Sequence, residues 1–278
     1  MKTHKLAIRG VNYHVEEYGL GRPLLLLHGF TGRGAVWRPF ADAWPGWRMI
    51  AVDLLGHGDT DAPDPNRCVM EQQVQDLLRL MEVLGERRFA VLGYSMGGRV
   101  ALALAVMRPE SVLGLVLESS SPGLRSAGER ADRRRADERL AAFLEERGLE
   151  PFVERWESLP LFATQGRLPP QVLARQRAIR LAQRPSGLAA SLRGLGTGCQ
   201  PSYWPQLRRL RMPTCLVTGD LDEKYTQIAK QMQECNPRLG RQVIQGAGHT
   251  VHLERPDAFA QTVAGFLRSL PPTSSEAG

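Results

Sequence analysis

The stretch "VLGYSMGGRV", residues 91–100, decides the fold. It joins an apolar run that ends at Leu92 to a second apolar run at 100–106, and it places Ser95 between two glycines. In a Gly-x-Ser-x-Gly sequence between a strand and a helix, the backbone turns so sharply that only glycines fit beside the turning residue. The serine is left in a strained conformation with its hydroxyl exposed near helix N-terminal amides. We therefore predict that Ser95 occupies a nucleophile elbow at a strand–turn–helix junction.

Short apolar runs that are typical of buried strands recur along the chain. They lie at 24–27, 49–52, 89–93, 112–118 and 214–219. Amphipathic stretches typical of helices lie between them, at 71–85, 97–107, 226–235 and 257–269. This alternation predicts an α/β fold with a mostly parallel central sheet flanked by helices on both faces. The alternating stretch at 4–19 is expected to add an antiparallel hairpin at one edge.

Residues 122–205 interrupt this alternation of strands and helices. They contain charged helical stretches such as "SAGERADRRRADERLAAFLEERG" (126–148), and no strand-like run follows until Thr214. We expect these residues to form a helical cap over the carboxyl edge of the sheet, where open α/β sheets bind ligands. The core domain is then expected at 1–121 and 206–270, with a disordered tail at 271–278.

The composition fits a soluble globular enzyme with a substantial core. The chain has 278 residues and a formal net charge of +7, carried almost wholly by arginine. This charge is consistent with a solvated basic surface or with an anionic small-molecule partner. No basic stripe with interleaved aromatic residues points to nucleic acid, and the longest apolar run near the N-terminus, at 24–27, is too short to cross a membrane. We expect a monomer or a weak homo-oligomer.

The four cysteines, Cys68, Cys199, Cys215 and Cys235, are far apart and form no CxxC pair. This spacing argues against a metal site. Because no secretory signal is present either, we expect reduced thiols in a cytoplasmic protein.

Two later motifs supply the partners that a reactive serine needs. Its hydroxyl requires a base, and the base requires an orienting acid, in the chain order Ser, Asp or Glu, His. His249, in the glycine-rich sequence "GAGHT" (246–250), is the predicted base. Asp220 and Asp222 are both candidates for the acid. Asp222 is preferred, because a residue directly after a strand tends to serve the turn itself.

Backbone N–H groups are expected to complete the site as an oxyanion hole. The two predicted donors are the N–H groups of Met96 and of Phe30, in the loop after the run at 24–27. His28 is expected to shape that loop rather than carry protons. His252 is expected to be a pocket wall or a structural histidine.

Arg99 is the one charged residue of an otherwise apolar helix. It follows Ser95 by four residues, and helical side chains lean toward the N-terminus, so its guanidinium should point toward Ser95 inside a pocket. A buried guanidinium needs a carboxylate partner, which either the protein or a substrate could supply. Arg133 and Arg180 are the cap arginines expected to join it.

These motifs together resemble one family. The sequences "HGF", "GHGDT" and "GAGHTVHLERP" are similar to α/β-hydrolase-fold proteins. The whole chain from about residue 10 to 269 resembles the menaquinone-pathway synthases that make 2-succinyl-6-hydroxy-2,4-cyclohexadiene-1-carboxylate. That resemblance is carried by "GYSMGGRVALALA", "ERADRRRADER", "WESLPLFATQ", "RLAQRPSGLAASLRGLGTGCQPSYWPQL" and "GDLDEKYTQIAKQM".

The resemblance implies a lyase that eliminates pyruvate from a cyclohexene bearing enolpyruvyl, succinyl and carboxylate groups, without a metal or organic cofactor. It implies that Arg99, Arg133 and Arg180 hold the carboxylates, and that Tyr94 and Trp156 line the pocket. The serine would then act as a general base rather than form an acyl-enzyme. Two alternatives stay open. One is a carboxylesterase or carbon–carbon bond hydrolase, which an apolar pocket would favour, and the other is a non-catalytic ligand receptor.

Overall fold

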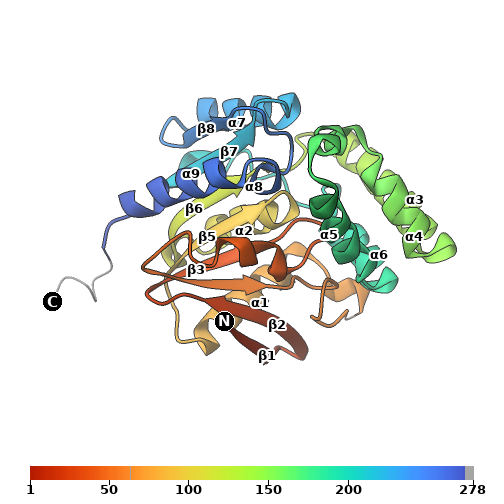
Figure 1. The fold of residues 1–278 in the computed structure, drawn as a ribbon, viewed down its shortest axis with the longest axis horizontal. Helices are drawn as coiled ribbons and strands as arrows, with labels where there is room; N and C mark the ends of the chain where they lie inside the picture. The colour runs from red at the N-terminus through yellow and green to blue at the C-terminus, as the bar shows by residue number, and fades with distance from the viewer. Residues whose placement is uncertain (63, 273–278) are drawn as a thin grey trace.

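The centre of the molecule is an eight-stranded sheet with helices on both faces (Figure 1). The computed structural model describes residues 1–62 and 64–272. The strands are β1 (Lys2–Ile8), β2 (Val11–Tyr18), β3 (Arg22–Leu27), β4 (Trp47–Val52), β5 (Phe89–Tyr94), β6 (Val112–Glu118), β7 (Thr214–Gly219) and β8 (Gly240–Ile244). Their spatial order is β1-β2-β4-β3-β5-β6-β7-β8. The pairs β1–β2 and β2–β4 are antiparallel and the other pairs are parallel. The predicted fold class and edge hairpin are therefore confirmed.

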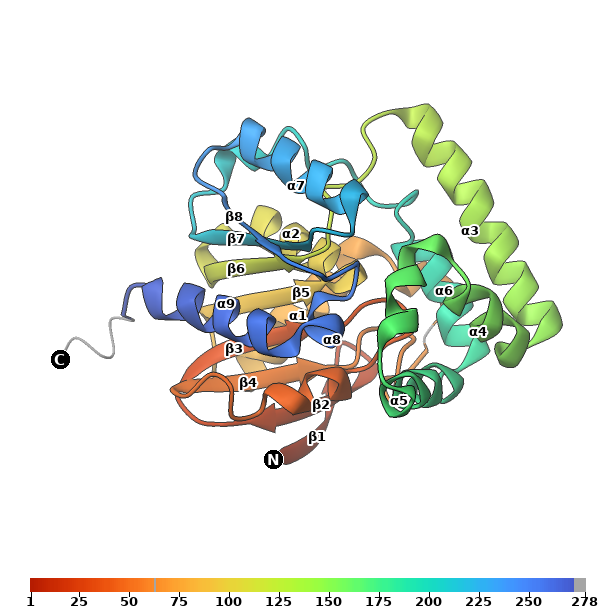
Figure 2. The ribbon, with the colours of Figure 1, turned by 45° about the horizontal axis from the view of Figure 1, so that its top comes forward.

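The chain between β6 and β7 is helical. It contains α3 (Ala127–Arg147), α4 (Leu149–Glu157), the 3-10 segment η4 (Pro160–Arg167), α5 (Pro170–Leu181) and α6 (Pro185–Leu195). These elements fall inside the range 122–205 and lie together at one end of the strands, with α3 outermost (Figure 2). Of these elements, α3, α4 and α6 share a small apolar cluster, made of Ala141, Leu144, Phe152, Val153, Leu188, Ala189 and Leu192.

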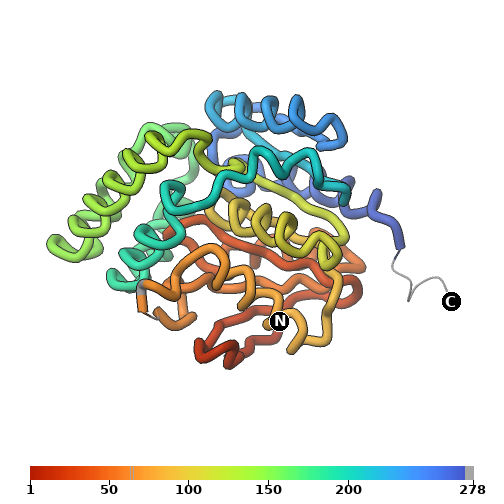
Figure 3. Tube along the Cα trace, turned by 180° about the vertical axis from the view of Figure 1, so that it is seen from behind, coloured from red at the N-terminus to blue at the C-terminus, as the bar shows by residue number. Residues whose placement is uncertain are grey.

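The strand sequences are continuously apolar because both faces of the sheet are covered. Since successive side chains of a strand point to opposite faces, Leu25 and Leu27 join one apolar cluster and Leu24 and Leu26 join the other. The first cluster includes α1 (Met70–Val83), α2 (Met96–Met107) and α7 (Glu223–Cys235), of which α1 and α2 lie in front of the sheet in Figure 3. The second includes η1 (Gly34–Phe40), α8 (Val251–Glu254) and α9 (Pro256–Ser269).

Two further sequence expectations concern the C-terminal tail and the membrane. The expected disordered tail at 271–278 lies, from residue 273 onward, outside the described residues. Across residues 1–62 and 64–272, no helix is both long enough and apolar enough to span a lipid bilayer.

Two buried histidines support the loops after β3 and β4. His28 donates from Nδ1 to the carbonyl oxygen of Gly29 (2.7 Å), and its Nε2 accepts the N–H of Leu54 (3.0 Å). This is the structural role expected for His28. The ring of His57 lies 5.1 Å from the ring of His28. Burial lowers the pKa of His28 to about 4 and that of His57 to about 3.

We expect the free energy of unfolding to decrease as the pH falls from about 6.5 toward 4. Both histidines have a lower pKa in the folded chain than the ordinary value of 6.5, so the unfolded chain binds protons first. The contribution of the two neutral histidines to the free energy of unfolding is complete above pH 6.5. It is lost as the pH approaches the pKa values of the folded chain. Urea denaturation between pH 7 and 5 should show a slope that approaches about 2.7 kcal/mol per pH unit for two protons. His57→Gln should halve that slope, and an unchanged slope would contradict the assignment.

Candidate active site

Ser95 lies on a turn that its glycine neighbours make possible. It follows β5 directly and precedes α2, with a φ of 50° and a ψ of −107°. A Cβ atom on Gly93 would collide with the carbonyl group of Gly97, and one on Gly97 would collide with the carbonyl of Leu27. A larger residue at position 93 would therefore open the turn, and one at position 97 would push α2 away from the end of β3. The structure confirms the predicted strand–turn–helix junction.

The structure brings Ser95, His249 and Asp222 together. The Nε2 atom of His249 lies 3.0 Å from Oγ of Ser95, and Nδ1 lies 2.7 Å from Oδ2 of Asp222. His249 and Asp222 are buried. A carboxylate can only accept, so Nδ1 of His249 carries the proton and Nε2 is free to accept the proton of the serine hydroxyl. The arrangement can therefore convert Ser95 into a base or a nucleophile.

The two candidate acids have different partners. Asp222 caps the N-terminus of α7, where its Oδ1 accepts the N–H of Tyr225 (3.3 Å). Asp220 instead accepts the N–H of Gly246 (2.6 Å) and the side-chain amide of Gln245 (2.9 Å). Of the two, Asp222 contacts His249, and Asp220 holds the turn.

Two backbone N–H groups beside Ser95 are available to a ligand. Met96 is the first residue of α2, so its N–H has no acceptor within the helix. Neither this group nor the N–H of Phe30 donates a hydrogen bond to another residue in the part of the chain that the structure describes. Both residues line the cavity that contains Ser95. They can therefore stabilise an oxygen that becomes negatively charged there.

A cavity of about 140 Å³ lies beside Ser95. It is lined by core and cap residues, among them Phe30, Tyr94, Arg99, Arg133, Trp156, Phe162, Lys224 and Tyr225. A second cavity of about 40 Å³ shares Phe30, Tyr94, Trp156 and Phe162 with the first. Arg180 lines this second cavity. Four of the five predicted substrate-binding residues therefore line the Ser95 cavity, and Arg180 lines its neighbour.

The guanidinium of Arg99 reaches the cavity without an acidic partner. Its Nη1 donates to the carbonyl oxygen of Leu195 (2.7 Å) and to Oε1 of Gln200 (3.0 Å). Within the described residues, no carboxylate oxygen lies within 4.0 Å of it. Burial lowers the pKa of Arg99 to about 10. A carboxylate partner for Arg99 could come from the protein or from a ligand. The described residues supply none, so this cation can pair with an anionic ligand.

The other two predicted arginines already have acidic partners. Nε of Arg133 lies 2.8 Å from Oδ1 of Asp137, and Nη1 of Arg180 lies 2.9 Å from Oε1 of Glu157. A guanidinium has five N–H donors, so each pair leaves donors for a ligand.

Tyr225 and Phe162 are site residues that the sequence interpretation missed. Their rings lie 4.6 Å and 6.1 Å from the ring of His249. Tyr225 had a usable signal, because it stands three residues after Asp222, one turn into the helix that Asp222 caps. Phe162 lies in the 3-10 segment η4, within the quoted motif "WESLPLFATQ", where no periodicity singles it out.

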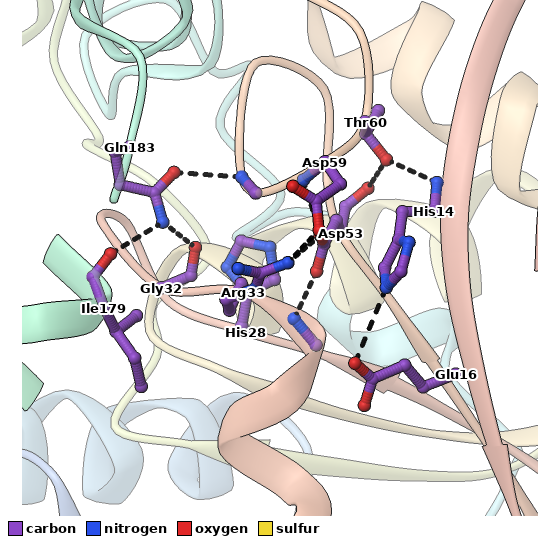
Figure 4. A network of polar contacts seen from close by, with 12 residues as sticks. His14, Glu16, His28, Gly32, Arg33, Asp53, Asp59, Thr60, Ile179 and Gln183 are labelled. Carbon is purple, nitrogen blue, oxygen red and sulfur yellow. Dashed lines mark hydrogen bonds and ion pairs between the residues drawn. The ribbon is translucent and has the colours of Figure 1, made fainter. Parts of the chain in front are cut away.

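One cluster outside this cavity has the composition of a metal site. Ligand atoms of His14, Asp53 and Asp59 lie within 4.8 Å of one another (Figure 4). Asp53 accepts the N–H groups of Gly34 (2.6 Å) and Asp59 (2.8 Å), and Arg33 pairs with both carboxylates. The guanidinium already supplies the positive charge at this place. The four cysteines are free thiols.

Comparisons with known proteins place this geometry in a family. The family model of the alpha/beta hydrolase fold matches residues 22–256. A Bacillus subtilis (strain 168) protein, provisionally named 2-succinyl-6-hydroxy-2,4-cyclohexadiene-1-carboxylate synthase, is 41% identical over 264 residues, which cover 94% of this chain and 96% of that protein. The synthase of the same name from Serratia proteamaculans (strain 568) is 30% identical, with 88% and 93% covered. The structure of MenH from S. aureus matches with a TM-score of 0.87 and 35% identity, over 92% of this chain and 97% of that one.

Proposed function

Because the chain belongs to the alpha/beta hydrolase fold family, and within it to the 2-succinyl-6-hydroxy-2,4-cyclohexadiene-1-carboxylate synthases, we propose that it is a lyase of menaquinone biosynthesis. Its substrate is 2-succinyl-5-enolpyruvyl-6-hydroxy-3-cyclohexene-1-carboxylate, from which it eliminates pyruvate. The observation that carries the proposal is the guanidinium of Arg99 in the Ser95 cavity with no carboxylate partner among the described residues. A neutral ester substrate offers no anion to pair with such a cation, whereas a substrate with three carboxylates does.

The first step is removal of the ring proton at C2, which is acidic because it lies next to the succinyl ketone. Asp222 orients His249, His249 accepts the hydroxyl proton of Ser95, and Oγ of Ser95 takes the C2 proton. Negative charge then develops on the ketone oxygen. The N–H groups of Met96 and Phe30 stabilise that charge.

The second step expels the enolpyruvyl group. The electron pair left at C2 forms the C2–C3 double bond, the C3–C4 double bond moves to C4–C5, and the C5–O bond breaks. The departing enolpyruvate takes up a proton at carbon and becomes pyruvate, and the proton removed from C2 leaves the triad. No acyl-enzyme forms, and these steps use no metal or organic cofactor.

The arginines hold the three carboxylates of the substrate in this proposal. Arg99 and Arg133 act in the Ser95 cavity and Arg180 acts in the adjoining one, with Tyr94 and Trp156 as walls. Residues 122–205, which supply two of the three arginines, act as a cap domain on the core formed by 1–121 and 206–270. We further propose a cytoplasmic enzyme that works as a monomer or weak homo-oligomer, without nucleic acid or a membrane.

The decisive experiment supplies the authentic pathway intermediate and follows pyruvate with a lactate dehydrogenase coupled assay. We expect purified enzyme to accelerate pyruvate release far above the spontaneous elimination. If micromolar enzyme leaves the spontaneous rate unchanged, the lyase proposal fails. A strong burst of p-nitrophenol from p-nitrophenyl acetate would instead favour the carboxylesterase alternative.

A further inference from the structure

The side chain of Gln183, just after α5, connects the cap to two loops of the core (Figure 4). Its Oε1 accepts the N–H of Gly58 (2.9 Å) in the loop after β4. Its Nε2 donates to the carbonyl oxygens of Gly32 (2.9 Å) and Thr31 (3.2 Å) in the loop after β3. The side chain is buried, with 5% of Gln183 exposed, so these bonds are shielded from water.

The loop after β3 is the one that carries the oxyanion donor Phe30. The next residue, Thr31, has a φ of 65°, a left-handed conformation that is unfavourable for a β-branched residue. Such a conformation persists only where its surroundings hold it in place. On the core side, His28 donates to Gly29, which also accepts the N–H of Gly32 (3.0 Å).

The cap side of that loop is held by Gln183. Its amide binds the carbonyl oxygen of Thr31 itself and that of Gly32. Without these bonds, Thr31 could relax toward an ordinary conformation, which would turn the neighbouring peptide groups. The N–H of Phe30, a residue that lines the Ser95 cavity, would then change its direction.

We propose that Gln183 is a positioning residue that completes the oxyanion hole when the cap is docked. It acts through the Thr31–Gly32 backbone and does not itself touch the reacting atoms. The inference rests on the proposed elimination, because the N–H of Phe30 is assigned there to the ketone oxygen. Closure of the cap and assembly of the oxyanion hole are then one event.

Gln183 could position the oxyanion hole or could only hold the cap against the core, and these two roles affect different kinetic constants. Charge on the ketone oxygen develops in the transition state, so a displaced Phe30 N–H lowers kcat. Loosening of the cap alone would act through Arg180, which lies three residues before Gln183, and would raise KM. The ratio of the two effects therefore separates the roles.

The test compares Gln183→Met, which removes all of these bonds, with Gln183→Glu, which keeps the acceptor for Gly58 but loses the donors to Thr31 and Gly32. Both variants should lower kcat for pyruvate release by about 10- to 100-fold, less than the loss of an oxyanion donor itself. KM should stay within about threefold, because ground-state binding is unaffected. Thermal melting checks that each variant is folded, and either variant alone carries the test.

Arg184→Ala is the matched control. Arg184 also joins the cap to the core, through a hydrogen bond to the carbonyl oxygen of Thr60, but among the described residues its side chain makes no hydrogen bond to the loop after β3. Its kcat should stay within about twofold of the wild type, since no oxyanion donor moves. Wild-type kcat in a folded Gln183 variant, an effect on KM alone, or an equal loss in Arg184→Ala would overturn the inference. Pyruvate release by the wild type shows that the proposed function itself holds.

Discussion

Ser95→Ala is expected to lower kcat for pyruvate release by about 10²- to 10⁴-fold, the range that general base catalysis contributes. The Oγ atom is the group that takes the ring proton, and His249 cannot reach the same position without it. The melting temperature should change little. The only hydrogen bond of the Ser95 side chain within the described residues is the one to His249, and alanine accepts the same backbone conformation about as well as serine.

Single-turnover measurements of pyruvate release, with thermal melting in parallel, test this expectation. Ser120→Ala is a suitable control, because Ser120 donates its hydroxyl proton to the backbone carbonyl of Ser95 (3.1 Å) and does not line the cavity. It should retain most of the wild-type kcat. A Ser95→Ala enzyme within about tenfold of the wild type would mean that the hydroxyl has no part in proton transfer.

Arg99→Met is expected to raise KM by about 10- to 150-fold. A hydrogen bond to a charged group contributes roughly 1.5–3 kcal/mol, and the substrate would lose one from the buried guanidinium. Methionine has an unbranched side chain that can replace the aliphatic part of arginine, and it carries no charge. The ketone, the oxyanion donors and the triad are unchanged, so kcat should change less than KM.

The same variant should melt close to the wild-type temperature. Removal of the desolvated guanidinium, which has no carboxylate partner among the described residues, is favourable, but the carbonyl oxygen of Leu195 and Oε1 of Gln200 lose their donor. Arg108→Met, at the exposed residue directly after α2, is the control and should leave KM and the melting temperature unchanged. A lowered melting temperature with a normal KM would show that Arg99 is a structural arginine.

The predictability of the fold follows from how its strands are buried. The core strands are covered on both faces, so β3 and β6 are continuous apolar runs that can be recognised without a structure. The helix boundaries were less accurate. α7 begins at Glu223, three residues before the predicted start, because Asp222 caps it with a side chain that was considered only as a catalytic acid. β8 is mostly exposed, so only its last two residues, Val243 and Ile244, are apolar.

The site was predictable where chemistry dictates local sequence. The Ser95 turn needs glycines, and a triad needs an acid and a histidine after late strands, so these residues follow from the chain alone. The residues that the cap contributes to the site do not follow from the sequence alone. Many arginines occupy the cap helices, and tertiary packing decides which of them face inward. Arg133 and Arg180 were chosen among the arginines of the cap helices, and the resemblance to a family added their carboxylate-binding role. Periodicity did not single out Gln183, although it lies in a motif that carries the resemblance, because its partners in the core lie more than 120 residues away.

The strands β6 and β7 are neighbours in the sheet although the whole stretch 119–213 separates them. The entropy lost on closing such a loop grows only with the logarithm of its length, by about 0.6 kcal/mol for each doubling. Evolution can therefore lengthen, shorten or replace the inserted helices at little thermodynamic cost to the sheet. The proton-transfer apparatus after β5, β7 and β8 would persist through such exchanges, while the choice of substrate changes with the insert.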